Sequence, residues 1–297
     1  MLTRYLYAKD EVEASLITSL LEKEDVCECY FWTYELFYSG FDIKDILWRI
    51  YYDFYFECNP QLEPYIYKKF SVWEERKEDS IFAFIVRNLF RSKVSSKVFV
   101  LRQMMTSGQT NSCLPPLISA DIGRPYKGRK PLWCKNHDSS YHHWLIAISK
   151  VDYINIAYHT YVMVETKNLD TLFDELAKYF ANFYDVKKDV REYWQTRDYK
   201  DDVHYLLSII VHLCDYGNSV SSSVLMVAPR EEHLIWIRSI CYENIVMNHK
   251  PYQVLSVARH YRTREDIGSF VLARENFNDL RSIYARWEDY ALSLIHI

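Results

Sequence analysis

The scarcity of glycine and proline is the feature that most constrains how this chain of 297 residues folds. It contains 6 Gly and 8 Pro, about 5% together, where average usage is roughly 12%. Because tight turns between strands depend on these residues, their scarcity argues against an all-β sandwich or barrel. Hydrophobic residues make up 49% of the chain, which excludes disordered, collagen-like and low-complexity classes.

Apolar residues recur at helical spacing along much of the chain. The clearest segments cover residues 11–21, 26–38 and 43–54, with Asp42 as an N-cap and Gly40 as a left-handed C-terminal cap. Further apolar runs cover residues 82–90, 94–105 and 205–213. The patterns predict an all-α fold with little or no β-sheet. Its helices form stacked antiparallel pairs, as in an α-solenoid or an irregular helical bundle.

A weak internal repeat accompanies these helices. Lys23, Asp25, Thr33 and Tyr34 match Lys150, Asp152, Thr160 and Tyr161 at one constant offset. The interpretation is a helical repeat. The alternative is that any two amphipathic helices align this well.

The glycines and prolines that do occur are concentrated between Ser107 and Tyr141. This stretch contains Pro115, Pro116, Pro125 and Pro131 with Gly108, Gly123 and Gly128. A loop of this length is often functional. We therefore expect an N-terminal helical region over residues 1–106, a basic loop over 107–141 and a C-terminal helical region over 142–291.

The last six residues, 292–297, are excluded from this division. Their codons can be read as CTG TCT CTT ATA CAC ATC, which resembles a transposon end used to prepare sequencing libraries. We interpret them as an adapter artefact that interrupts the natural chain near Ala291. The alternative is a natural apolar tail.

The net charge of −4 conceals a reversal along the chain. Residues 1–83 and 136–297 are acidic on balance, whereas residues 84–135 contain Asp121 as their only acid. Clustered Lys and Arg favour binding of anions, most simply a nucleic-acid backbone. The alternatives are internal pairing with the acidic flanks and an acidic protein partner. The candidate residues for nucleic-acid or anion binding are Arg87, Arg91, Arg124, Lys127, Arg129 and Lys130.

One group of side chains has the ligand types that zinc accepts. Cys134, His137 and His142 lie close together, but their spacing fits no standard zinc finger and no CxxC pair accompanies them. We rate this metal site a weak candidate, and ordinary loop residues are the favoured interpretation.

No catalytic motif stands out. The chain has no G-x-S-x-G, no P-loop and no G-x-G-x-x-G. No cofactor and no catalytic residue is therefore predicted, and enzyme activity stays uncertain with the balance against it.

Aromatic residues make up 16% of the chain and surround the predicted helices. Rings on all sides of a helix indicate burial on more than one face. The favoured interpretation is helix–helix packing, and the alternative is an interaction surface.

The termini and cysteines indicate a compartment. The first fifteen residues carry charges that a signal peptide lacks, no apolar run is long enough to span a membrane, and the seven cysteines are scattered. We expect an intracellular protein with reduced thiols and no membrane partner.

Several segments resemble uncharacterised proteins of large nucleocytoplasmic DNA viruses. They are residues 31–40, 51–55, 126–131, 154–158 and 266–270. The resemblance implies a viral origin, with the host cytoplasm, nucleus or viral factory as the location. We expect a non-catalytic scaffold or adaptor for protein–protein interaction. The alternative is a nucleic-acid-binding accessory factor in viral replication, transcription or packaging that uses residues 84–135.

Overall fold

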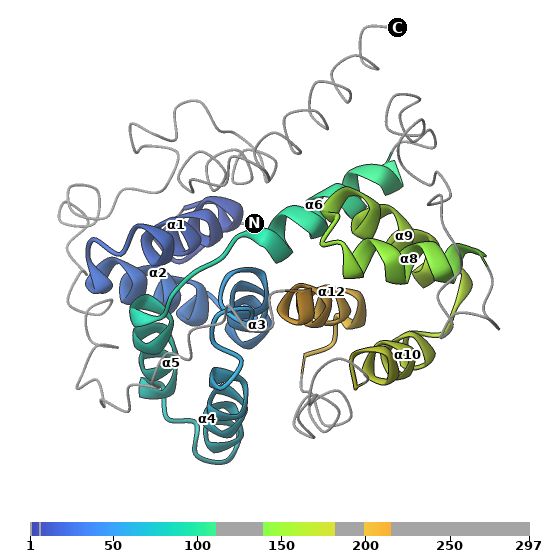
Figure 1. Ribbon diagram of the computed structural model, residues 1–297. Coiled ribbons are helices and arrows are strands. Elements are labelled where there is room, and N and C mark those ends of the chain that lie inside the picture. The colour runs from blue at the N-terminus through green and yellow to red at the C-terminus, as the bar shows by residue number, and fades with distance from the viewer. Residues whose placement is uncertain (1, 6, 111–138, 182–198, 215–297) are drawn as a thin grey trace, which may run out of the picture. The chain divides into compact units, whose positions relative to one another are not determined.

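The computed structural model describes residues 2–5, 7–110, 139–181 and 199–214. These ranges contain ten α-helices and no strand apart from one isolated bridge between Leu2 and Ala8 (Figure 1). The all-α prediction is therefore confirmed. The chain divides into two compact units, and within the described residues the boundary falls between Ser95 and Ser96.

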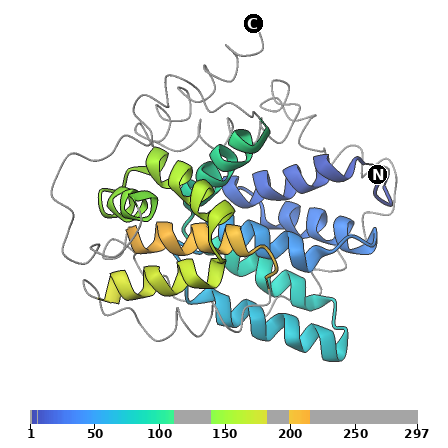
Figure 2. The same ribbon diagram turned by 90° about the vertical axis from the view of Figure 1, so that its right-hand side faces the viewer.

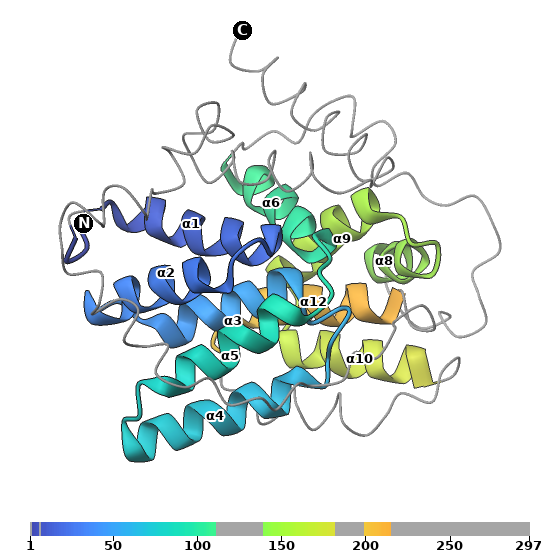
Figure 3. The ribbon, with the colours of Figure 1, turned by 90° about the vertical axis from the view of Figure 1, so that its left-hand side faces the viewer.

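Unit 1 contains five of the described helices. They are α1 (Lys9–Glu22), α2 (Val26–Tyr38), α3 (Ile43–Phe54), α4 (Leu62–Arg76) and α5 (Ser80–Arg91). Helix α1 packs on α2, α2 on α5, and α5 on α4 (Figure 3). The Asp42 side chain caps α3 by accepting a hydrogen bond from the Asp45 N–H. Gly40 has a φ of +82° after α2, as the sequence predicts.

Helix α4 was not predicted from the sequence. In the sequence, Pro60 and Pro64 interrupt the helical spacing of residues 43–54 and predict a break there, yet α4 begins at Leu62 and Pro64 lies in its first turn. Proline is tolerated there because the N–H groups of the first turn have no acceptor within the helix. The buried residues Ile66 and Phe70 then fix the inner face of the helix.

Aromatic side chains hold the helices of unit 1 together. The ring centroid of Phe82 on α5 lies 4.7 Å from that of Phe37 on α2 and 5.3 Å from that of Trp73 on α4. On the other side, Trp48 of α3 lies 5.5 Å from Phe70 of α4. Such tilted and edge-on pairs contribute about 1 kcal/mol each beyond the area they bury. The favoured interpretation of the aromatic content as packing holds for these residues.

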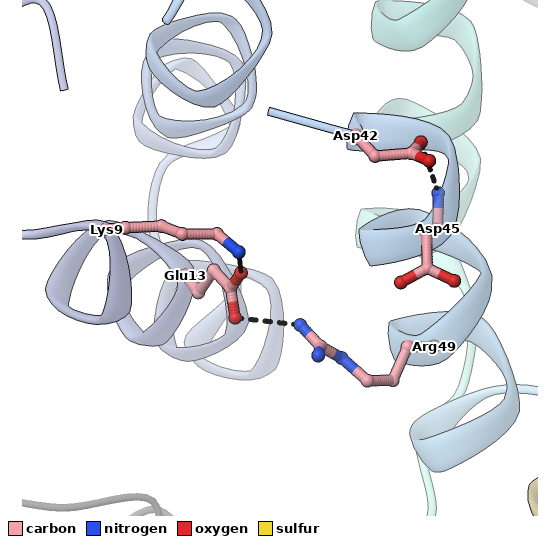
Figure 4. A network of polar contacts seen from close by, with 5 residues as sticks. All are labelled: Lys9, Glu13, Asp42, Asp45 and Arg49. Carbon is pink, nitrogen blue, oxygen red and sulfur yellow. Dashed lines mark hydrogen bonds and ion pairs between the residues drawn. The ribbon is translucent and has the colours of Figure 1, made fainter. Parts of the chain in front are cut away.

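A buried carboxylate adds a polar connection between α1 and α3. Glu13 is 8% exposed and accepts from Arg49 Nη2 at 2.8 Å and from Lys9 Nζ at 3.2 Å (Figure 4). Because both cations approach the same carboxylate, the cost of burying it is offset.

Unit 2 contains the other described helices. They are α6 (Lys97–Thr110), α8 (Ser139–Ser149), α9 (Tyr153–Thr166), α10 (Leu169–Ala181) and α12 (Asp202–Cys214). Helix α12 is buried over residues 204–213, because it contacts α6, α8 and α10 (Figure 2). A helix that is buried on all sides is typical of the centre of a bundle. Residues 111–138 of the predicted loop lie outside the described ranges, and its two ends are helical.

The two units share local features at the offset noted in the sequence. The side chains of Asp25 and Asp152 cap α2 and α9 by accepting backbone N–H bonds. Thr33 and Thr160 are both fully buried within these helices. The helical repeat stays a prediction.

Replacing Phe82 by Ala should destabilise unit 1 by about 3–5 kcal/mol, because a fully buried ring is removed and leaves a cavity. Urea unfolding followed by circular dichroism measures the change. The control is Tyr67→Ala, which removes a ring that is 47% exposed and should change stability by no more than about 0.5 kcal/mol. Equal effects of the two substitutions would contradict the role given to the aromatic core.

Candidate polyanion-binding surface

Helix α5 has an apolar inner side and a basic outer side. Phe82 and Ile85 are fully buried. Phe84, Arg87 and Arg91 follow one another three and four residues apart, so they share the opposite side of the helix. Phe84 and Arg87 are half-buried and Arg91 is exposed.

Helix α4 adds two lysines beside this side of α5. The ammonium group of Lys69 lies 4.0 Å from the ring centroid of Phe84 and 5.5 Å from that of Tyr65. The Asn88 amide of α5 donates to the Tyr65 hydroxyl at 3.3 Å. These contacts place Lys69 at the α4–α5 junction, and the residue before it on α4, Lys68, is exposed.

Further positive charge lies at the C-terminal end of α5. The half-buried Lys23 donates from its ammonium group to the carbonyl of Ser92, the C-cap residue of α5. Lys93 follows and is exposed, with its carbonyl accepting from the Asn59 amide at 2.8 Å. Cations are favoured at a helix C-terminus by the helix dipole. We use the term α5 basic face for Lys68, Lys69, Arg87, Arg91 and Lys93.

Three acidic residues of unit 1, Glu13, Glu74 and Glu78, form described ion pairs with cations outside this face. These pairs join Lys9 and Arg49 to Glu13, Lys44 to Glu74, and Arg76 to Glu78. Within the described part of the chain, no ion pair joins a carboxylate to Lys68, Lys69, Arg91 or Lys93. Internal pairing, the alternative explanation of the basic segment 84–135, is thus not seen for Arg91 and Lys93.

Burial and like charge act on Lys69. Partial burial lowers the pKa of the Lys69 ammonium group, the neighbouring Lys68 lowers it further, and Glu78 partly opposes both. Partial burial also lowers the pKa of Lys23. An anion bound beside these ammonium groups would raise the pKa of Lys69 and of Lys23, because an opposite charge favours the protonated form.

The structure describes only part of the predicted anion-binding set. Arg87 and Arg91 lie on α5 as described above, whereas Arg124, Lys127, Arg129 and Lys130 lie outside the described residues.

Two lysines of the face were missed by the sequence analysis. Lys68 and Lys69 belong to a segment that is acidic on balance, and helix α4 was not predicted around them. The adjacent lysine pair was the available signal in the sequence. It indicates an anion-binding surface only when the position of α4 beside α5 is known.

The weak metal candidate is described only at His142, which is buried on α8, because Cys134 and His137 lie outside the described ranges. Where the structure is described, no group of three or more His, Cys, Asp or Glu side chains is arranged to hold a metal ion.

The same region contains a buried histidine with unusual electrostatics. His159 on α9 is 4% exposed, and its ring centroid lies 5.7 Å from that of His143. Burial, followed by the nearby His143, lowers the pKa of His159 to about 4, with Asp152 opposing them. The imidazole of His159 is therefore neutral at pH 7.

No family model matches the chain, and no match was found among curated proteins or solved structures. None of the described helices is long and apolar enough to cross a membrane. The resemblance to proteins of large DNA viruses stays a prediction.

Replacing His159 by Gln should flatten the pH dependence of stability. The pKa of His159 is lower in the folded protein than the unfolded value near 6.5, so the folded protein favours the neutral imidazole. The resulting contribution to the free energy of unfolding is complete above pH 6.5. As the pH falls toward about 4, up to about 3 kcal/mol of this stabilisation is lost. Urea unfolding at several pH values, compared with the H159Q variant, measures this component. Parallel curves for the two proteins would contradict it.

Proposed function

We propose that the chain binds nucleic acid along the α5 basic face, with the cations contacting the sugar–phosphate backbone. One observation carries the proposal. Four basic side chains lie on the neighbouring helices α4 and α5, and Lys93 follows the end of α5; three of the five, Lys68, Arg91 and Lys93, are exposed. Clustered cations of this kind bind phosphates and release counterions.

The dimensions of the face suit a backbone. One end of the α5 basic face is the contact between Lys69 and Phe84, and Arg91 lies seven residues after Phe84 on α5. At 1.5 Å per residue this separation is about 10 Å, and Lys93 extends it. A strand rises about 3.4 Å per nucleotide in a duplex, so the face spans several phosphates.

The proposal requires no catalytic step. Specificity for a base sequence would need contacts to base edges, and backbone binding alone suits an accessory role. The non-catalytic scaffold or adaptor for protein–protein interaction stays a second prediction from the sequence. An acidic protein partner, the other alternative for the basic segment, would use the same cations.

Substituting Arg91 and Lys93 together by Gln should weaken nucleic-acid binding and reduce its salt dependence. Each lost phosphate contact lowers the slope of log K against log salt by about 1. Fluorescence anisotropy with a labelled oligonucleotide at about 50–200 mM salt measures both quantities.

The matched control is the double substitution of Lys9 and Lys44 by Gln. It removes the same formal charge from unit 1, but at residues already paired with Glu13 and Glu74. It should leave the slope unchanged. Absence of binding at low salt, equal effects of the two double variants, or preferential binding of poly-glutamate would each contradict the proposal.

A further inference from the structure

Two aromatic side chains of α5 differ from the rings of the core. Phe82 contacts the rings of Phe37 and Trp73. Phe84 and Phe90 are instead half-buried. Among the described residues, no aromatic ring contacts either of them. Burial inside the aromatic core therefore does not account for their position.

These rings alternate with the cations of the α5 basic face. Phe84 and Arg87 are one turn apart on the outer side of α5, and Arg91 lies one turn further. Phe90 flanks both arginines along the helix, about 9 Å from Phe84 at 1.5 Å per residue. Flat apolar surface and positive charge thus repeat along one helix.

A single strand of nucleic acid has two kinds of surface, charged phosphates and flat base faces, that match the cations and rings of α5. Its phosphates require cations, and its unpaired bases expose flat faces that stack on aromatic side chains. In a duplex the base faces are stacked inside the helix, so only the phosphates and the groove edges are accessible. The rings therefore favour a single strand, whereas the cations alone would serve either form.

We infer that the α5 basic face binds single-stranded nucleic acid. Bases stack on Phe84 and Phe90, and phosphates contact Lys69, Arg87 and Arg91. This inference rests on the proposed function and specifies the ligand of the same face.

Lys69 links the two parts of the site. In the protein without ligand its ammonium group lies over the Phe84 ring at 4.0 Å, a favourable cation–π contact. On binding, the ammonium group exchanges the ring for a phosphate, and a base takes the place that it leaves. The nucleotide thereby replaces a contact that the protein makes with itself.

The test compares a single strand of about 15 nucleotides with a duplex of equal length by fluorescence anisotropy. We expect the single strand to bind at least about tenfold more tightly. Substituting Phe84 and Phe90 together by Leu should lower single-strand affinity about tenfold or more, because both π faces are lost. The salt slope should not change, since the phosphate contacts remain.

Two variants control the interpretation. Replacing Phe84 and Phe90 by Tyr keeps both rings and should retain the affinity, even if the leucine variant folds poorly. Tyr67→Leu removes an exposed ring of α4 that lies two residues from Lys69, about 160° around the helix. It should have no effect.

The outcomes separate the two claims. Equal affinity for both oligonucleotides, together with unchanged binding by the leucine variant, would overturn the single-strand inference and leave backbone binding intact. Loss of affinity in the tyrosine variant or in Tyr67→Leu would also overturn it, because stacking at these two rings would not be the cause. Binding of neither oligonucleotide would overturn the proposed function and the inference with it.

Discussion

The contact of Phe82 with Phe37 and Trp73 is the interaction on which the described part of unit 1 depends most. It joins α5 to α2 and α4 through the fully buried ring of Phe82, which contacts the half-buried rings of Phe37 and Trp73. Because α5 is anchored along its inner side, its outer side is held at a fixed orientation. A rigid helix can therefore carry Arg87 and Arg91 at a constant spacing, which a loop could not ensure.

The paired carboxylates and the α5 basic face lie on different parts of unit 1. The net charge of the chain does not show this separation. Glu13 is buried between Lys9 and Arg49, and Glu74 pairs with Lys44. These pairs neutralise cations on other helices, while Lys69 at the α4–α5 junction lies beside the rings of Tyr65 and Phe84. A chain that is acidic overall thus presents a locally positive face, and local potential rather than net charge governs which partners are attracted.

Much of the fold could be predicted from the sequence, because helical spacing and caps are local properties. The bounds of α2 and the left-handed cap at Gly40 agree with the structure. Helix α4 was missed because Pro64 was interpreted as a break rather than as a residue of the first turn. Lys68 and Lys69 were missed for a different reason. Their role depends on contacts with Phe84 across two helices, and a charge count along the chain cannot detect such contacts.

The central claim is that nucleic acid lies along α4 and α5 of unit 1. Ultraviolet crosslinking of a bound oligonucleotide, followed by mass spectrometry of the digested protein, tests it most directly, because aromatic side chains in contact with bases form such crosslinks. We expect crosslinked peptides within residues 62–93, with Phe84 or Phe90 among the modified residues. Crosslinks confined to unit 2, or spread evenly over the chain, would contradict it.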